Sequence, residues 1–201
     1  MDDLTLKWKD RFERVWDPAG EGRYRMGSPG QRLAPRFLEY VPVGASINEY
    51  GSGTGRPVVR IKQIRPDVSV NMVDLASNAL EEEARNLVYG GESRVTFIEA
   101  CLWNLPGDFP IADWGYCVDV LMCVPPEKLD AILRNIRMTC RSLFAQVYDW
   151  PDKRLGINYT TIMEGPEWWE AKFRQFWTFV ERIKSLEHPR RYIYVCRGGA
   201  Q

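Results

Sequence analysis

The sequence predicts a doubly wound α/β fold with a mostly parallel sheet. From residue 46 onward, strand-like segments alternate with segments of helical character, which indicates parallel β-α-β units. A run of closely spaced glycines follows the first strand-like segment. The last two strand-like segments have only a loop between them, too short for a crossover helix. The sheet should therefore begin with parallel strands and end with an antiparallel pair.

The parallel part is expected from five segments of strand length that are rich in apolar and β-branched residues. These strands are expected at residues 45–50, 68–73, 95–99, 114–118 and 143–148. Helical segments are expected between or after them, at residues 55–64, 77–90, 125–138 and 167–173.

Capping residues support the helix assignments. Ser77 is expected to be the N-cap of the second of these helices, with acidic residues 81–83 early in it, where carboxylates favour the helix dipole. The Gly-Gly pair at 90–91 is expected to end this helix. The Pro-Pro-Glu segment at 125–127 should open the next one, because proline is tolerated in a first turn.

The end of the chain should form a hairpin. Residues 176–180 and 192–195 are both strand-like, and the intervening segment has no helical pattern. These two strands are therefore expected to pair antiparallel.

Residues 1–45 differ in pattern from the rest and are expected to form a helical cap or lid on one structural unit of residues 46–201. Trp8 and Phe12 recur at helical spacing, which predicts a short amphipathic helix. A second helix is expected at residues 32–40. Between the two helices, glycine and proline interrupt regular structure.

The charge and the termini exclude some function classes. The 201 residues include 27 basic and 27 acidic side chains, so the basic excess typical of nucleic-acid-binding domains is absent. No apolar run approaches the roughly 20 residues that span a bilayer. The acidic N-terminus lacks the features of a signal peptide. We expect a cytoplasmic protein that does not engage a membrane; its oligomeric state is left open.

Cysteine and histidine usage argues against a metal site. The five cysteines are odd in number and lack metal-type spacing, so we interpret them as reduced, mostly buried thiols. His188 is the only histidine. With one histidine, neither a His-based metal site nor a Ser-His-Asp triad is favoured. No metal is expected.

A glycine-rich turn follows the first expected strand. Gly51, Gly53 and Gly55 stand at every second position, where glycine allows a sharp turn and close approach of a ligand to the main chain. The helix that follows would present unpaired N–H groups there. A dinucleotide fingerprint needs its third glycine at position 56, which is Arg56 here. The turn therefore indicates a nucleotide-type cofactor and disfavours a nicotinamide dinucleotide.

The stretch from Glu49 to Gly55 resembles the first motif of the class I S-adenosylmethionine-dependent methyltransferases. The resemblance implies a seven-stranded sheet of order 3-2-1-4-5-7-6 with strand seven antiparallel. It also implies S-adenosyl-L-methionine as cofactor, with Glu49 holding its ammonium group. Asp74, at the tip of the second strand, would accept hydrogen bonds from both ribose hydroxyls; a helix N-cap is the alternative role.

Segments after the third and fourth strands resemble later motifs of the family. Cys101 stands where aspartate commonly meets the adenine amino group, but a thiol is a weak hydrogen-bonding group, and a buried apolar role is the alternative. Asp119 would contact the methionine part or be a loop acid. The cofactor contacts that the resemblance implies in this part of the chain are Glu49, Gly51, Ser52, Gly53, Gly55, Asp74, Leu75, Cys101, Leu102, Asp119 and Val120.

Two further segments are candidates for ligand contact. Arg25, next to Tyr24, has a two-pronged donor suited to the cofactor carboxylate, with a solvated surface arginine as the alternative. Tyr24 is a candidate for the substrate side. Trp168 and Trp169 lie in an aromatic-rich late segment and are expected to form a wall for a planar or cationic acceptor. The alternative is that they pack the last helix on the sheet.

No catalytic residue is evident, since methyl transfer depends mainly on alignment and needs a base only when the nucleophile must lose a proton. Tyr148 and Asp149, at the tip of the fifth strand, and His188 are weak candidates. His188 is disfavoured because the loop of the terminal hairpin is expected to lie away from the cofactor.

The favoured function is S-adenosylmethionine-dependent methyl transfer to a small molecule. An RNA- or DNA-modifying methyltransferase is one alternative, although the net charge does not indicate a nucleic-acid partner. Cys123-Val124-Pro125-Pro126 lacks the polar and aromatic residues typical of enzymes that methylate exocyclic base amines. A non-catalytic S-adenosylmethionine-binding regulatory or assembly protein is the other alternative.

Overall fold

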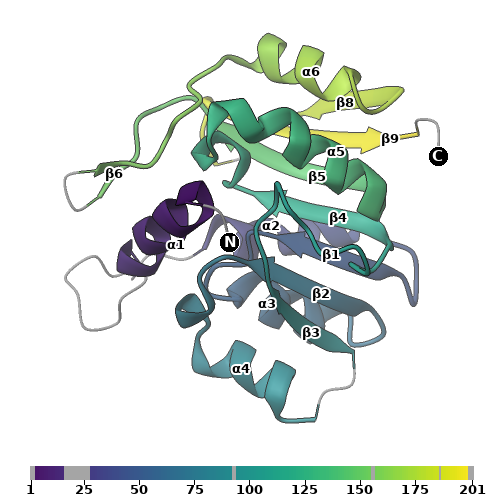
Figure 1. Ribbon diagram of the computed structural model, residues 1–201. Coiled ribbons are helices and arrows are strands. Elements are labelled where there is room, and N and C mark those ends of the chain that lie inside the picture. Colours follow the sequence, from purple (N-terminus) through teal and green to yellow (C-terminus); the bar gives the residue numbers. More distant parts are fainter. Residues whose placement is uncertain (1–2, 16–27, 92–93, 155–156, 186, 199–201) are drawn as a thin grey trace.

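One seven-stranded sheet forms the centre of the protein, with strand order β3-β2-β1-β4-β5-β9-β8 (Figure 1). The computed structural model describes residues 3–15, 28–91, 94–154, 157–185 and 187–198. Strands β6 and β7 form a separate short ribbon. When the seven strands of the main sheet alone are numbered along the chain, their order is 3-2-1-4-5-7-6. The predicted topology is confirmed.

The elements follow the expected alternation. The strands of the main sheet are β1 (Ser46–Tyr50), β2 (Ser69–Asp74), β3 (Val95–Glu99), β4 (Ala112–Val118), β5 (Cys140–Tyr148), β8 (Phe179–Ile183) and β9 (Arg191–Arg197). The helices are α1 (Asp3–Val15), α2 (Pro29–Leu38), α3 (Arg56–Ile64), α4 (Glu82–Tyr89), α5 (Leu129–Thr139) and α6 (Pro166–Arg174). The short ribbon pairs β6 (Lys153–Arg154) with β7 (Ile157–Asn158), and three 3-10 turns are η1 (Ser77–Ala79), η2 (Leu121–Cys123) and η3 (Pro126–Lys128).

The terminal strands pair antiparallel as expected, but the loop between them lies at a different edge than predicted. Strand β9 runs antiparallel to both β5 and β8. Its first residue, Arg191, pairs with Tyr148, the last residue of β5. The loop that holds His188 therefore lies at the carboxyl edge of the parallel strands, and the expectation that it lies at the opposite edge is wrong. The reason is topological: a strand antiparallel to β5 begins where β5 ends.

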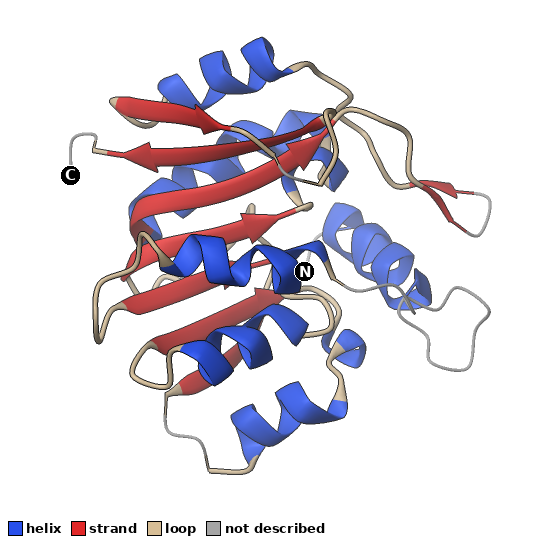
Figure 2. Cartoon of the chain, turned by 180° about the vertical axis from the view of Figure 1, so that it is seen from behind, coloured by secondary structure: helices blue, strands red, loops and turns tan. Residues whose placement is uncertain are grey.

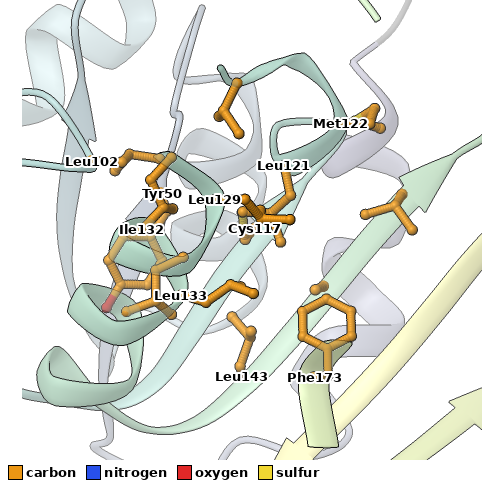
Figure 3. Packing of buried hydrophobic residues seen from close by; sticks show 14 of the residues in the cluster. Tyr50, Leu102, Cys117, Leu121, Met122, Leu129, Ile132, Leu133, Leu143 and Phe173 are labelled. Atoms are coloured by element: carbon orange, nitrogen blue, oxygen red, sulfur yellow. The ribbon is translucent and has the colours of Figure 1, made fainter. Parts of the chain in front are cut away.

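Helices cover both faces of the sheet. Helices α5 and α6 lie on the face turned toward the viewer in Figure 1, and α2 and α3 lie on the other face, which Figure 2 shows. Each face has its own cluster of buried apolar side chains. Figure 3 shows part of the cluster under α5 and α6, where Ile132 and Leu133 of α5 pack with Tyr50 of β1 and Leu143 of β5. Burying each such aliphatic side chain contributes about 1.5–3 kcal/mol.

Helix α2 belongs to the covering layer of the sheet. Phe37 is fully buried and stacks on Tyr116 with 4.5 Å between ring centroids. The Tyr116 hydroxyl donates a hydrogen bond to the carbonyl oxygen of Gly30 at 2.6 Å. Helix α1, by contrast, stands beyond the carboxyl ends of the parallel strands, beside the β6–β7 ribbon (Figures 1 and 2). Of the segment expected to form a cap, α1 is the part that has a lid-like position.

Two predicted helix starts were wrong. Ser77 begins the η1 turn, and the N-cap of α4 is Glu81. The chain first makes a tight 3-10 turn here because Asp74 accepts a hydrogen bond from the backbone N–H of Ala76 at 2.9 Å. Similarly, the Pro-Pro-Glu segment forms η3, and α5 begins only at Leu129.

The strand expected at residues 176–180 is displaced toward the C-terminus. The backbone N–H groups of Phe176 and Trp177 donate to the carbonyl oxygen of Phe173 at 2.9 and 3.0 Å, so these aromatic residues prolong the last turn of α6. Trp177 is buried in the core. Aromatic content suits a buried turn as well as a strand, which is why the pattern misplaced β8.

Candidate functional site

A cavity lies at the carboxyl ends of β1, β2, β4 and β5, and α1 also contributes to its wall. This is the edge at which open α/β sheets bind ligands. The residues that line it are Trp8, Phe12, Ser28, Pro29, Gly30, Glu49, Gly51, Ser52, Gly53, Thr54, Pro57, Asp74, Leu75, Ala100, Leu102, Trp103, Val118, Asp119, Val120, Cys123, Val124, Tyr148, Asp152 and Tyr159. Nine of the twelve predicted cofactor residues are among them; Gly55 and Cys101 are not, and Arg25 lies outside the described residues.

The glycine turn is folded tightly against the end of β2. The N–H groups of Gly51 and Ser52 donate to the carbonyl oxygen of Val73 at 2.8 and 3.2 Å. Gly55 has a φ of 74°, and a Cβ atom there would lie 2.4 Å from Cβ of Ala84 in α4. Gly55 is therefore needed for close packing of the turn on α4.

Glu49 is a buried acid at the floor of the cavity. It is 3% exposed, and its Oε2 atom has no hydrogen-bond partner within the part of the chain that the structure describes. Burial raises the pKa of Glu49 well above its usual value, and the neighbouring Asp74 carboxylate raises it further. A buried carboxylate is stable only when paired, so this position suits a cationic group from a ligand.

Asp74 holds the glycine turn and the η1 turn together. Its Oδ2 atom accepts a hydrogen bond from Gly53 N–H at 2.8 Å, and its Oδ1 atom accepts one from Ala76 N–H at 2.9 Å. Burial raises the pKa of Asp74. It does not cap α4, whose N-cap is Glu81. Each carboxylate oxygen has a second lone pair, and Asp74 lines the cavity, so it can also accept hydrogen bonds from a bound ligand.

The start of α3 is poorly suited to a pyrophosphate. Arg56 occupies the position of the third glycine in a dinucleotide fingerprint, and it forms an ion pair with Glu81 at 2.6 Å. Pro57 stands in the first turn and has no N–H group to offer an anion. These features agree with the expectation that the turn does not serve a dinucleotide.

Asp119 directly follows β4 in a strained conformation and forms contacts with β5 and β9. Its φ is 59°, which among residues with a side chain is uncommon. Gln146 donates a hydrogen bond to Asp119 Oδ1 at 2.9 Å, and Arg191 of β9 forms an ion pair with Oδ2 at 2.9 Å. Burial raises the pKa of Asp119 to about 6, although Arg191 opposes the shift. Asp119 lines the cavity beside Val120.

The side of the cavity next to β2 and β3 is apolar. Leu75, Leu102 and Trp103 line it, together with Ala100. Cys101 is buried and forms an isolated bridge with Asn104, outside the cavity lining. All five cysteines are buried thiols outside disulfides. A flat apolar ligand fits this side, and the buried apolar interpretation describes Cys101 better than direct contact with a ligand.

The two predicted tryptophans do not reach the cavity. Trp169 is fully buried and packs on Phe173 in the core under α6. Trp168 is 37% exposed and lies under the ammonium group of Lys172, on the outside of α6. Neither tryptophan can therefore form a wall of this cavity, and the alternative, packing of the last helix on the sheet, describes Trp169. Tyr24 and Arg25 lie outside the described residues.

One of the three catalytic candidates lines the cavity. Tyr148 is buried there, and its hydroxyl donates a hydrogen bond to Asp152 Oδ2 at 3.3 Å. Burial raises the pKa of Tyr148. Asp149 lies outside the lining, where it accepts hydrogen bonds from Arg190 and Tyr192. His188 is exposed and packs against Trp150 with 5.0 Å between ring centroids.

Several lining residues come from segments for which no role in binding was predicted. Trp8 and Phe12 lie on α1, and Asp152 and Tyr159 lie in the segment after β5 that carries the β6–β7 ribbon. Helical spacing placed Trp8 and Phe12 on one face of a helix, but it did not indicate that this face lines the cavity. No sequence signal identified Asp152 or Tyr159.

Helix α1 is attached on two sides of the cavity. Lys9 donates a hydrogen bond to the carbonyl oxygen of Leu75 at 3.1 Å and forms an ion pair with Glu99 at the end of β3. On the other side, Arg11 donates a hydrogen bond to the carbonyl oxygen of Asn158, and Tyr159 donates one to the carbonyl oxygen of Arg11 at 3.3 Å. Helix α1 therefore bridges the ligand-binding edge from β3 to the segment after β5.

The described part of the chain contains neither a candidate metal site nor a membrane-spanning helix. It contains no group of three or more His, Cys, Asp or Glu side chains arranged to hold a metal ion. None of its helices combines the length and the apolar character that crossing a membrane requires.

No family model matches this sequence, and no curated protein matches it either. Solved structures do resemble it. The 1,6-didemethyltoxoflavin N1-methyltransferase of Burkholderia thailandensis, solved with S-adenosylhomocysteine and 1,6-didemethyltoxoflavin bound, has a TM-score of 0.72 at 15% identity, with 99% of this chain and 92% of that one covered. The magnesium protoporphyrin IX methyltransferase of Synechocystis PCC 6803, solved with S-adenosylmethionine, has a TM-score of 0.66 at 15% identity, with 98% and 99% covered.

An O-methyltransferase family protein from Burkholderia thailandensis is also similar, with a TM-score of 0.63 at 15% identity. The match covers 85% of this chain and 58% of that protein, so this chain spans little more than half of that relative. All three structures share the sheet-and-helix architecture described above. This chain therefore has the fold of the class I S-adenosylmethionine-dependent methyltransferases.

Proposed function

We propose that this protein is an S-adenosylmethionine-dependent methyltransferase that acts on a small molecule. The observation that carries the proposal is the buried Glu49 carboxyl group, which belongs to the cavity lining and whose Oε2 atom has no hydrogen-bond partner among the described residues. A cofactor with an ammonium group supplies the missing partner. The three similar structures named above are all methyltransferases, which supports the same cofactor.

Residues at the ends of successive strands would contact successive parts of this cofactor. Glu49 on β1 would pair with the ammonium group, and Asp74 on β2 would accept hydrogen bonds from the ribose hydroxyls. Leu75, Leu102 and Trp103 would pack on the adenine ring. When bound, the cofactor supplies an electrophilic methyl group on a sulfonium centre.

The acceptor would lie on the other side of Glu49, over β4 and β5. There the cavity is lined by Tyr148 and by aromatic side chains of α1 and the segment after β5. Because α1 bridges the binding edge and is held on both sides, the site suits a molecule that can be enclosed. The zero net charge gives no support to a nucleic-acid acceptor.

Calorimetry with S-adenosylhomocysteine tests the cofactor assignment. We expect binding by the unaltered protein and a loss of affinity of about tenfold or more in Asp74→Ala, because the ribose hydroxyls lose a charged acceptor. Asp108→Ala is the control, because Asp108 is an exposed acid outside the cavity. Absence of binding, or equal affinity in both variants, would contradict the proposal.

A non-catalytic cofactor-binding protein would pass this test. Transfer of labelled methyl groups from S-adenosylmethionine to a library of small molecules separates the two functions. A methylated product that requires Glu49 and Asp74 supports the enzyme, whereas binding without any product favours the regulatory or assembly role.

A further inference from the structure

The charge inside the cavity is one-sided. Four acids line it, namely Glu49, Asp74, Asp119 and Asp152, whereas no lysine, arginine or histidine is found among the described lining residues. From outside the lining, Arg191 forms an ion pair with Asp119, and the Arg11 guanidinium lies over the rings of Trp8 and Tyr159. Glu49 and Asp74 have roles in the proposed cofactor site. Asp152 is the carboxylate of the cavity that the proposed function leaves without a role.

Asp152 is held in place by the segment around it. Its backbone N–H donates to Thr160 Oγ1 at 3.0 Å, and its carbonyl oxygen accepts a hydrogen bond from Tyr159 N–H at 2.7 Å. Its side chain accepts the hydrogen bond of the Tyr148 hydroxyl at 3.3 Å. The carboxylate therefore has a fixed place next to the end of β5, on the side of the cavity assigned above to the acceptor.

Aromatic rings adjoin this acid. Phe12 lies between Trp8 and Tyr159, with centroid separations of 5.8 and 6.0 Å, and all three rings line the cavity. Tyr159 is separated from Asp152 by the short ribbon and lies beside it through the backbone hydrogen bond described above. Aromatic faces attract cations, and a carboxylate next to them strengthens this preference.

We propose that the methyl acceptor is a small arylalkylamine, with a primary or secondary amino group that enters as an ammonium ion paired with Asp152. The body of the amine packs against Trp8, Phe12 and Tyr159. This inference rests on the proposed function, which it deepens by naming the class of acceptor. The described lining contains four acids and no lysine, arginine or histidine, which disfavours an anionic acceptor.

The chemical step balances with Asp152 as the proton acceptor. One ammonium proton passes to the Asp152 carboxylate, which frees the lone pair on nitrogen. The lone pair forms the new N–C bond to the methyl carbon, while the C–S bond breaks and its electron pair stays on sulfur. The product leaves as the methylated ammonium ion, and Asp152 returns its proton to solvent.

Matched ligands test the class of acceptor. The probes are 2-phenylethylamine, 2-phenylethanol and phenylacetate, together with the corresponding indole series, each titrated into protein saturated with S-adenosylhomocysteine. We expect each amine to bind about tenfold or more tightly than its alcohol, and the carboxylates to bind least. Amine members of the set should also accept labelled methyl groups from S-adenosylmethionine.

Two variants test whether Asp152 is responsible for the preference for amines over alcohols. Asp152→Asn keeps the shape of the side chain and should remove the advantage of amine over alcohol, with the affinity for S-adenosylhomocysteine unchanged. Asp149→Asn is the control, because Asp149 is a nearby acid outside the lining, and it should keep the advantage. Thermal unfolding of both variants checks that each of them retains the fold.

The outcomes separate the two proposals. If S-adenosylhomocysteine does not bind, the proposed function fails. If it binds but the amines have no advantage over alcohols and carboxylates, or if Asp152→Asn preserves that advantage, the amine assignment is overturned and the proposed function stands.

Discussion

A Cβ atom placed on Gly51 would lie 2.4 Å from Cγ2 of Val120. Gly51 also has a φ of 73°, in the left-handed region that favours glycine. The glycine turn after β1 and the residue that follows Asp119 after β4 are thus packed together where both line the cavity. Contact within the protein requires glycine at position 51, independently of any ligand.

Gly51→Ala should therefore destabilise the protein even without cofactor. We expect a loss of about 1–3 kcal/mol in the free energy of unfolding, from the strained backbone and the overlap with Val120. Val120→Ala in the same chain should restore the part that comes from overlap. Urea denaturation measures both changes.

Gly107→Ala is the matched control, because a Cβ atom at Gly107 meets no atom within 4 Å. Its stability should stay within about 0.5 kcal/mol of the unaltered protein. If Gly51→Ala were as stable as Gly107→Ala, the contact with Val120 would not constrain the turn.

Glu49 should make cofactor binding depend on pH. Burial raises its pKa well above the ordinary value of 4.5, so between these two values the carboxyl group is protonated in the free protein. Pairing with an ammonium group requires the ionised form. Affinity for S-adenosylhomocysteine should therefore increase as pH rises through the raised pKa, with release of one proton from Glu49 on binding.

Calorimetry between about pH 5 and pH 8 checks this expectation. Glu49→Gln has no charge to gain, so it should bind about tenfold or more weakly and lack the part of the pH dependence that comes from Glu49. A variant that keeps the full pH dependence would show that another group is responsible.

The sheet could be predicted because each of its signals is local. Strands such as β2 have runs of apolar and β-branched residues, and the lack of a crossover helix before β9 required an antiparallel pair. The position of β8 could not be predicted, since Phe176 and Trp177 suit a buried turn as well as a strand. The β6–β7 ribbon, with two residues in each strand, is too short to give a pattern.

Part of the candidate site could also be predicted from the sequence, and part of it could not. Glu49 and Asp74 follow from sequence because parallel strands bring their carboxyl ends to one edge. The acceptor side could not be predicted, because it depends on tertiary contacts between α1 and the segment after β5. Periodicity places Trp8 and Phe12 on one helix face, but it does not reveal that this face meets Tyr159.

Asp119 should make stability fall as pH rises. Its pKa is raised from 3.8 to about 6, so the folded protein binds the proton more tightly than the unfolded chain. This contribution is fully present below the unfolded value and is lost as pH rises through the interval from about 4 to about 6. Urea denaturation over this interval should show a smaller decline in Asp119→Asn, which cannot ionise.

Arg191→Met is the complementary change, because it removes the ion pair while Asp119 stays in place. Leaving that largely buried carboxylate without its cationic partner should cost about 3 kcal/mol at neutral pH. The cost should diminish when Asp119 is protonated at low pH. A cost independent of pH would assign the effect of Arg191 to its packing on Tyr148 and Trp150.

Arg11 should control how often α1 opens. Its guanidinium group lies 4.6 Å from the ring centroid of Trp8 and 4.8 Å from that of Tyr159, and it also donates to the carbonyl oxygen of Asn158. Each cation–π contact is worth about 0.5–1 kcal/mol, and one hydrogen bond adds a similar amount. Arg11→Met keeps the apolar stem and the helix propensity but loses these contacts, so opening should be favoured about tenfold or more.

Amide hydrogen exchange of α1 and the dissociation rate of S-adenosylhomocysteine measure this effect. Both should increase in Arg11→Met. Arg14→Met is the control on the same helix, because Arg14 is exposed and pairs with Asp10 one turn earlier. Its exchange and dissociation rates should match those of the unaltered protein, since that pair stays within α1. Equal rates in the two variants would mean that the Arg11 side chain does not hold α1.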